Sequence, residues 1–219
     1  MIKSILFVIV SMFYILSCNA PKQNQNPQTG SSDENIQSFL DARRGKWTDF
    51  NVPYEDGRAL EKLVVENSSK NILEIGTSSG HSTIWLAKGA AKTGGKVTTI
   101  EIDEGRFHKA RQNFAEAGVS HLVTQKLGDA MKIIPTLNGE FDFVFSDATW
   151  STQPQDGYLM FFKLTNPKLK TGGLYTMHNV SDGAGDDGRF FRYLDSLGNF
   201  QTHVINATSR GISVSKKLR

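Results

Sequence analysis

The sequence predicts an α/β fold in which a mostly parallel sheet carries helices on both faces. From Asn71 onward, short apolar runs of strand length alternate with longer amphipathic stretches, and this alternation is typical of parallel sheets. The last two runs, residues 200–205 and 211–215, are separated by only a short turn, so they should pair as an antiparallel hairpin. We therefore expect a seven-stranded sheet closed by a C-terminal antiparallel hairpin.

The individual elements follow from apolar periodicity and from residues that begin or end a helix. The Thr-Gly-Gly turn at residues 93–95 separates a helical stretch from the next strand. Asp103 is a typical N-cap of the helix that follows, and Gly118 is a typical helix stop. The expected strands cover residues 71–75, 96–100, 123–127, 141–145, 173–177, 200–205 and 211–215, and the expected helices cover residues 81–91, 103–117, 158–164 and 189–197.

The N-terminus reads as a signal peptide over residues 1–18. Lys3 precedes an apolar run that ends at Leu16, and this run is shorter than the ~20 residues that span a bilayer. Residues 15–18, Ile-Leu-Ser-Cys, resemble a bacterial lipobox, in which Cys18 would become the lipidated first residue. The alternative is an uncleaved hydrophobic anchor. Both interpretations predict a membrane-anchored protein, and the lipobox predicts a lipoprotein.

Composition divides the rest of the chain into a linker and one domain. Residues 19–35 are rich in Asn, Gln, Pro and Ser, with almost nothing to bury, which predicts a flexible linker. Residues 36–219 are expected to form a single domain. The net charge is +3, from 25 basic and 22 acidic residues. This small excess, scattered along the chain, does not favour a nucleic-acid partner.

The most informative stretch runs from the first strand into a loop bounded by Gly76 and Gly80. Glycines at these positions would let the backbone approach a ligand where a Cβ would collide. The helix that follows presents free N–H groups and the positive end of its dipole, which suits a carboxylate as well as a phosphate. Ser82 is placed to donate its hydroxyl to the same anion.

The spacing of this loop separates the possible cofactors. A dinucleotide fold uses G-x-G-x-x-G, whereas this loop reads G-x-x-x-G and lacks the Gly-Lys-Ser/Thr ending of a P-loop. Glu74, just before the loop, would repel a bound pyrophosphate but attract an ammonium or sulfonium group. The carboxylate therefore favours S-adenosylmethionine (SAM) over a nicotinamide cofactor.

Two further acidic residues follow neighbouring strands. Glu101 ends the second strand, where a carboxylate can accept hydrogen bonds from both ribose hydroxyls. Asp129 follows the third strand, where it would meet an adenine amino group or, alternatively, cap the next helix.

Together these features resemble the class I SAM-dependent methyltransferases, which have a Rossmann-like α/β fold, and within them the metal-dependent O-methyltransferases of the catechol and caffeoyl-CoA type. The resemblance covers about residues 52–214 and depends on LEIGTSSGHS, TTIEID, LGDA, FDFVFSDA and TGGLYTMHNV, with FQTHVINATSRGISVSKK similar to that family's terminal hairpin. It implies that Ser82 binds the methionine carboxylate and Glu101 the ribose. The SAM contacts that it implies are Glu74, Gly76, Gly80, Ser82, Glu101, Asp129 and Asp147.

The resembled family holds a divalent cation with an Asp after the fourth strand and an Asp-Asn pair after the fifth. The cation lowers the pKa of the acceptor hydroxyl and orients it, commonly with help from a lysine three residues past the first Asp. Here Asp147 stands at the first position, His178-Asn179 replaces the pair, and Trp150 stands at the lysine position. This donor set is poor for Mg²⁺, and an imidazole suits Mn²⁺, Fe²⁺ or Zn²⁺ better.

Three interpretations of this altered centre stay open. In the first, Asp147, His178 and Asn179 hold a metal. In the second, His178 acts directly as a general base, because an imidazole titrates near neutral pH. In the third, His178 only packs at the strand end, and the chain is a catalytically inactive SAM- or nucleoside-binding protein of the same fold. A nicotinamide-dependent oxidoreductase is disfavoured by Glu74 and by the missing middle glycine.

The expected function is methyl transfer from SAM to a hydroxyl of a small, aromatic acceptor, with His178 and Asp147 as catalytic residues. A flat acceptor could lie against Trp47, Phe50, Tyr54 and Trp150, although the first three could equally form the underside of an N-terminal helix. The resemblance also implies a homodimer. SAM is made in the cytoplasm, whereas a signal peptide directs export, so the side of the membrane stays open.

Overall fold

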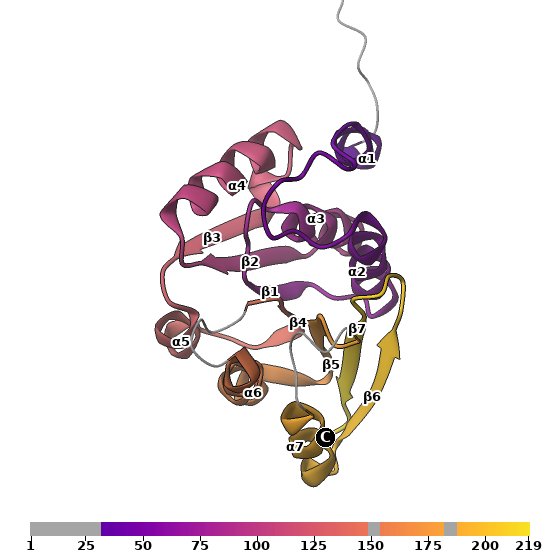
Figure 1. Cartoon of the computed structure of the whole chain (residues 1–219), viewed down its shortest axis with the longest axis vertical. Coiled ribbons are helices and arrows are strands. Elements are labelled where there is room, and N and C mark those ends of the chain that lie inside the picture. Colours follow the sequence, from indigo (N-terminus) through magenta and orange to yellow (C-terminus); the bar gives the residue numbers. More distant parts are fainter. Residues whose placement is uncertain (1–31, 149–153, 182–187) are drawn as a thin grey trace, which may run out of the picture.

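The computed structural model describes residues 32–148, 154–181 and 188–219, and Figure 1 shows their arrangement. The described part begins with helix α1 (Ser32–Ala42), so the predicted boundary between linker and domain, at residue 36, falls inside this helix. No helix of the described part is long and apolar enough to cross a membrane. The predicted signal peptide, Cys18 and most of the predicted linker lie outside the described residues, and the membrane tether stays a prediction.

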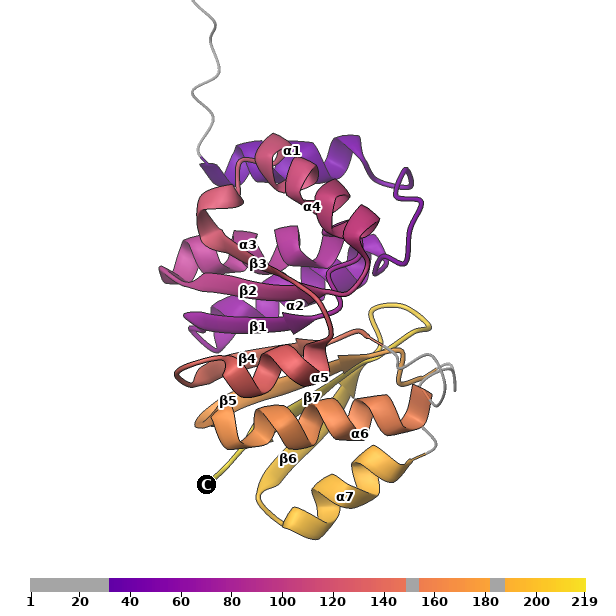
Figure 2. The same ribbon diagram turned by 90° about the vertical axis from the view of Figure 1, so that its left-hand side faces the viewer.

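Seven strands form one sheet in the order β3-β2-β1-β4-β5-β7-β6, as Figure 2 shows from top to bottom. Strands β1 to β5 are parallel, whereas β7 runs antiparallel to both β5 and β6. This confirms the predicted sheet and hairpin. The strands are β1 (Asn71–Ile75), β2 (Lys96–Glu101), β3 (Val123–Leu127), β4 (Phe141–Ser146), β5 (Leu169–His178), β6 (Phe200–Ile205) and β7 (Ile212–Lys217).

The helices cover both faces of the sheet, as predicted, because alternate residues of a strand point to opposite sides. Ile72 and Phe143 belong to one buried cluster, whereas their neighbours Leu73 and Val144 belong to the other. The first cluster packs against α1, α2 (Tyr54–Glu66), α3 (His81–Thr93) and α4 (Glu104–Glu116). The second packs against α5 (Ala130–Ile133), α6 (Pro154–Thr165) and α7 (Arg189–Leu197).

The order of the strands places a ligand site at one edge of the sheet. The chain builds outward from β1 through β2 to β3 and then returns to the other side of β1 as β4. At such a reversal the loops that leave the carboxyl ends of neighbouring strands diverge, and a crevice opens between them. The crevice here lies between β1 and β4.

Helix α2 approaches α3 very closely. A Cβ on Gly57 would lie 2.2 Å from the Trp85 ring, so only a glycine allows this distance. The close approach brings Asp56, the residue before Gly57, into the fully buried interior.

Candidate functional site

A cavity of about 440 Å³ opens at the carboxyl ends of β1, β2, β3 and β4, a size typical of small-molecule sites. Glu101, Asp129 and Asp147 place three carboxyl groups in its wall, and Arg106 places one guanidinium there. The wall therefore favours a ligand with positive charge over a diphosphate. It is lined by Phe50, Ile75, Gly76, Ser78, Ile100, Glu101, Ile102, Arg106, Gly128, Asp129, Ala130, Asp147, Ala148 and Phe161.

The Glu101 carboxylate is held firmly at the end of β2. Its Oε2 accepts a hydrogen bond from the Ser78 backbone N–H at 2.7 Å. Its Oε1 accepts bonds from two backbone N–H groups of the following turn and from the Arg106 guanidinium, whose Nη2 lies 3.0 Å away. Arg106 donates through both Nε and Nη2, so four donor atoms converge on Oε1 and only one donates to Oε2. Oε2 is therefore the more accessible acceptor for a ligand hydroxyl.

Asp129 takes the capping role that was one of its two predicted roles, and its contact with an adenine amino group stays a prediction. Its Oδ1 accepts a hydrogen bond from the Met131 N–H at 2.9 Å, which makes it the N-cap of α5, and it also lines the cavity. The N-cap role predicted for Asp103 is confirmed by its bond from the Arg106 N–H.

The two loop glycines are required by packing inside the protein. Gly76 has φ +95°, and a Cβ there would lie 2.7 Å from the backbone oxygen of Asp147. Gly80 has φ +93°, and a Cβ there would lie 2.5 Å from the Phe114 ring of α4. Both positions disfavour a side chain on steric and conformational grounds. Gly76 lines the cavity, whereas Gly80 does not, and the approach of both glycines to a ligand stays a prediction.

Glu74 and Ser82 lie behind the cavity wall. The buried Glu74 carboxylate accepts hydrogen bonds from Ser82 at 2.5 Å, from Thr99 at 2.6 Å and from Thr83. Burial raises the pKa of Glu74 to about 7, against the opposing effect of these hydroxyls. The carboxylate therefore ties β1 to β2 and to the first turn of α3. Neither Glu74 nor Ser82 lines the cavity, and their direct contact with a cofactor stays a prediction.

Asp147, His178 and Asn179 meet at the ends of β4 and β5, as the sequence suggested. The His178 Nδ1 donates to Asp147 Oδ1 at 3.2 Å, and the Asn179 side-chain amide lies 3.3 Å from the same oxygen. Asp147 lines the cavity, whereas His178 lies behind it with only 4% of its side chain exposed. Of the two predicted catalytic residues, Asp147 is the one that a bound ligand can reach.

A fourth residue, Asp56 from α2, completes this group. The His178 Nε2 donates to Asp56 Oδ2 at 2.9 Å, and the Thr208 hydroxyl donates to the same oxygen at 2.7 Å. Burial alone would lower the pKa of His178, but the hydrogen bonds and charges of Asp147 and Asp56 outweigh it and raise the pKa to about 9. The ring is therefore a cation at neutral pH, which does not suit a general base.

These residues do not fit a divalent metal as they are arranged. A histidine ligand offers a metal the lone pair of one ring nitrogen, yet both His178 nitrogens donate to carboxylates. No group of three His, Cys, Asp or Glu residues in the described ranges could hold a metal ion.

Sequence reasoning missed Asp56, Thr208, Ser78 and Arg106. A signal for Asp56 was present, because it lies four and eight residues before the buried Leu60 and Val64 of α2. An acidic residue on the apolar face of a helix indicates a buried partner. The other three residues come from loops or from an exposed helix turn, where the sequence carries no comparable pattern.

The aromatic residues divide between core and cavity. Trp47 stacks on His81 with ring centroids 4.6 Å apart, and Tyr54 packs edge-on against Trp85. Phe50 lines the cavity and is 85% exposed. Tyr54 thus packs from the first residue of α2, close to the helical alternative predicted for it, whereas Trp47 packs from the loop between α1 and α2 and Phe50 is free to contact a ligand. Trp150 lies outside the described residues.

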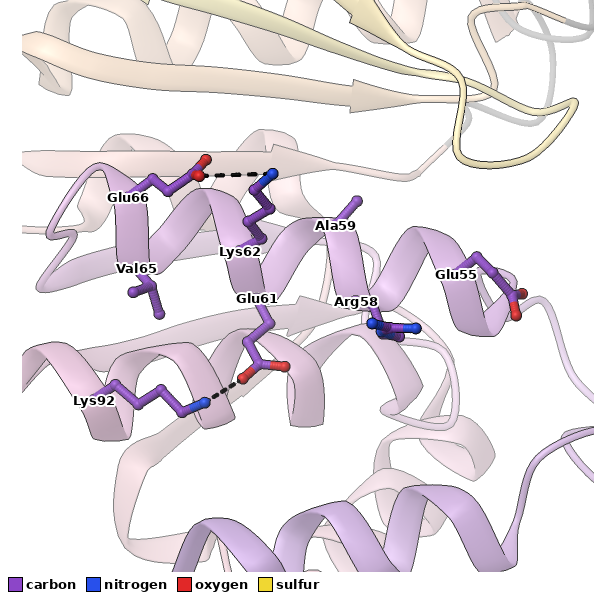
Figure 3. A pocket seen from close by; sticks show the side chains of 8 residues that line it. All are labelled: Glu55, Arg58, Ala59, Glu61, Lys62, Val65, Glu66 and Lys92. Atoms are coloured by element: carbon purple, nitrogen blue, oxygen red, sulfur yellow. Dashed lines mark hydrogen bonds and ion pairs between the residues drawn. The ribbon is translucent and has the colours of Figure 1, made fainter.

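A second hollow, of about 530 Å³, lies on the outer side of α2 beside α3 (Figure 3). Four of its charged side chains pair with one another, with Lys92 2.7 Å from Glu61 and Lys62 3.7 Å from Glu66. No strand end contributes to its lining. The crevice between β1 and β4 is therefore the better candidate for a ligand site.

The fold and this crevice define a Rossmann-like domain of the type that binds nucleoside cofactors. Comparison with known proteins agrees, since the family model described as a methyltransferase domain matches residues 73–180. A putative O-methyltransferase of Mycobacterium bovis is 35% identical over 166 residues, which are 73% of this chain and 70% of the relative. The chain therefore belongs to the O-methyltransferase family, within the class I SAM-dependent methyltransferases, as the sequence suggested.

Two further relatives are informative. The catechol O-methyltransferase of Mycobacterium tuberculosis is 34% identical over 135 residues, 61% of this chain and 59% of the relative. The solved structure of the O-methyltransferase TomG from Streptomyces achromogenes, in complex with SAM, has a TM-score of 0.69 and 28% identity, and the match covers 85% of this chain and 90% of that one. The chain spans about three fifths of the length of the catechol and caffeoyl-CoA relatives that it matches.

Proposed function

We propose that this protein transfers a methyl group from SAM to a hydroxyl of a small, aromatic acceptor. The observation that carries the proposal is the cavity wall, in which Glu101, Asp129 and Asp147 place carboxyl groups at the carboxyl ends of β2, β3 and β4. This wall suits a sulfonium nucleoside and opposes a diphosphate. The SAM complex of the relative TomG supports the same cofactor.

The residues present fit SAM. Glu101 would accept hydrogen bonds from the ribose hydroxyls through Oε2, and Asp129 would accept one from the adenine amino group. The Ser78 hydroxyl is buried in the same wall and has no hydrogen-bond partner among the described residues. A buried hydroxyl without a partner is costly, and a polar cofactor in the cavity would supply one.

Bound SAM supplies an electrophilic methyl group on a positively charged sulfur. Asp147 would accept a hydrogen bond from the acceptor hydroxyl, take up its proton on the carboxylate and release it to solvent, because it is the member of the His178 group that lines the cavity. His178 and Asn179 hold the Asp147 carboxylate in place. The exposed ring of Phe50 at the rim suits an aromatic acceptor.

The test is an assay for S-adenosylhomocysteine and methylated product, with SAM and catechol-type acceptors. We expect turnover by the wild type. In Asp147→Asn the rate of methyl transfer should fall by at least about a hundredfold, which is within the range that general acid–base residues contribute. Asp195→Asn, at an exposed position on α7, is the matched control and should keep full activity. Equal rates for the two variants would contradict the role of Asp147.

A second candidate is a SAM-binding protein without catalysis. It is favoured by the arrangement of His178, whose ring nitrogens are both hydrogen-bonded to carboxylates and therefore cannot accept a proton. Stoichiometric SAM binding with no product from any hydroxylated acceptor would support this candidate over methyl transfer.

A further inference from the structure

Three elements of the chain meet in a buried bridge of two carboxylates and one imidazole. Asp56 comes from α2, Asp147 follows β4, and His178 ends β5. The imidazole lies between the two carboxylates, 2.9 Å from one and 3.2 Å from the other. Asp56 is fully buried, and only 4% of the His178 side chain is exposed. We call this group the Asp56–His178–Asp147 bridge.

In this bridge the imidazole of His178 is not available as a ligand for a metal ion. Each ring nitrogen is hydrogen-bonded to a carboxylate, Nε2 to Asp56 and Nδ1 to Asp147, so neither is left over to coordinate a cation. A cation would have to displace one carboxylate from the ring before the imidazole could coordinate it. The Thr208 hydroxyl, from the loop between β6 and β7, strengthens the Asp56 end.

The role of the imidazole in this bridge is to balance the negative charges of the two carboxylates. Asp56 is fully buried and Asp147 is partly buried, and two such carboxylates on either side of one ring are stabilised by a positive charge between them. In this chain the imidazole lies between the two carboxylates and hydrogen-bonds to both, so it can supply that charge from within the fold.

We propose that His178, fixed between Asp56 and Asp147, takes the place of a divalent cation, so that this protein neither binds nor needs one at its site. Asp56 is the positioning residue that keeps the ring there. That methyl transfer needs no divalent cation rests on the proposed function, whereas the absence of cation binding at this site does not depend on it.

The test is a titration of the full chain with Mn²⁺ alone, in which the electron paramagnetic resonance signal reports free Mn²⁺. His178→Asp exchanges the ring for a third carboxylate beside Asp56 and Asp147, and oxygen ligands suit Mn²⁺ and Mg²⁺. Asp56 Oδ1 has no hydrogen-bond partner among the described residues, so it is free to become a ligand. We expect no binding by the wild type and one Mn²⁺ per chain in His178→Asp.

The matched control is His203→Asp, which adds the same carboxylate at an exposed position on β6. We expect His178→Asp to bind Mn²⁺ at least about tenfold more tightly than this control. A folded His178→Asp that binds no better would overturn the proposal. Binding of one Mn²⁺ per wild-type chain that is lost in Asp147→Ala would also overturn the proposal. If His178→Asp does not fold, this titration of the wild type and Asp147→Ala is the deciding measurement.

A second readout separates this proposal from the proposed function. Methyl transfer by the wild type should change less than twofold after treatment with EDTA, and a tenfold loss that Mn²⁺ or Mg²⁺ restores would contradict metal independence. If no acceptor is methylated, the proposed function fails, but the Mn²⁺ titration still decides whether the bridge excludes a metal.

Discussion

Replacing Asp56 by alanine should lower the free energy of unfolding by about 3 to 5 kcal/mol, the usual cost of removing one partner from a buried ion pair. The variant leaves the His178 ring with one carboxylate in place of two and removes the acceptor of the Thr208 hydroxyl. Urea denaturation followed by circular dichroism measures the change.

The control for this prediction is Glu55→Ala, the neighbouring acid on the same helix. Glu55 pairs with Arg44 at the surface, and such pairs contribute about 0 to 1 kcal/mol. His178→Ala in the Asp56→Ala background should cost less than it does alone, because the ring has then already lost one of its two carboxylate partners. Additive effects of the two substitutions would show that they do not interact.

The second large effect is expected from Gly76→Ala, which should reduce SAM affinity by more than about tenfold and also destabilise the fold. The new Cβ would lie 2.7 Å from the Asp147 backbone oxygen, and overpacking of this kind costs about 1 to 3 kcal/mol. Relief of the clash moves the end of β1 away from the end of β4, and these ends form the cavity. Calorimetric titration with SAM measures the loss.

Gly139→Ala separates the clash from backbone strain. Gly139 also has a positive φ, +84°, but no atom lies within 4 Å of the added Cβ. This control should lose about 1 kcal/mol to the left-handed conformation and keep its SAM affinity. If both variants bind SAM as the wild type does, close contact between the ends of β1 and β4 does not shape the site.

The fold was predictable because its signals are local. Strands β1 and β3 and helix α7 have the predicted bounds, since an apolar run or a helical period is complete within one element. The antiparallel hairpin followed from the short turn between β6 and β7. Strand β5 is longer than predicted, from Leu169 to His178, because its two central glycines suggested a turn but lie within the strand.

The site was only partly predictable because its contacts join distant segments. Glu101, Asp129 and Asp147 were identified because each follows a strand, and the carboxyl ends of parallel strands meet at one edge. The partner of His178 on α2 lies 122 residues away in the sequence. Similarly, the three hydroxyls on α3 and β2 that hydrogen-bond to Glu74 were not predicted. No pattern within one strand reports such bonds.

The most direct test of the central claim is a calorimetric titration of the full chain with SAM and, separately, with NAD. A cavity wall with carboxyl groups at positions 101, 129 and 147 should bind one SAM per chain and give no heat with the diphosphate. Glu101→Gln should lower the affinity for SAM by about tenfold to a hundredfold, the contribution of a hydrogen bond to a charged group. Glu104→Gln, at an exposed position, should leave the affinity for SAM unchanged. Binding of NAD as tight as that of SAM, or equal SAM affinities for the two variants, would contradict the account.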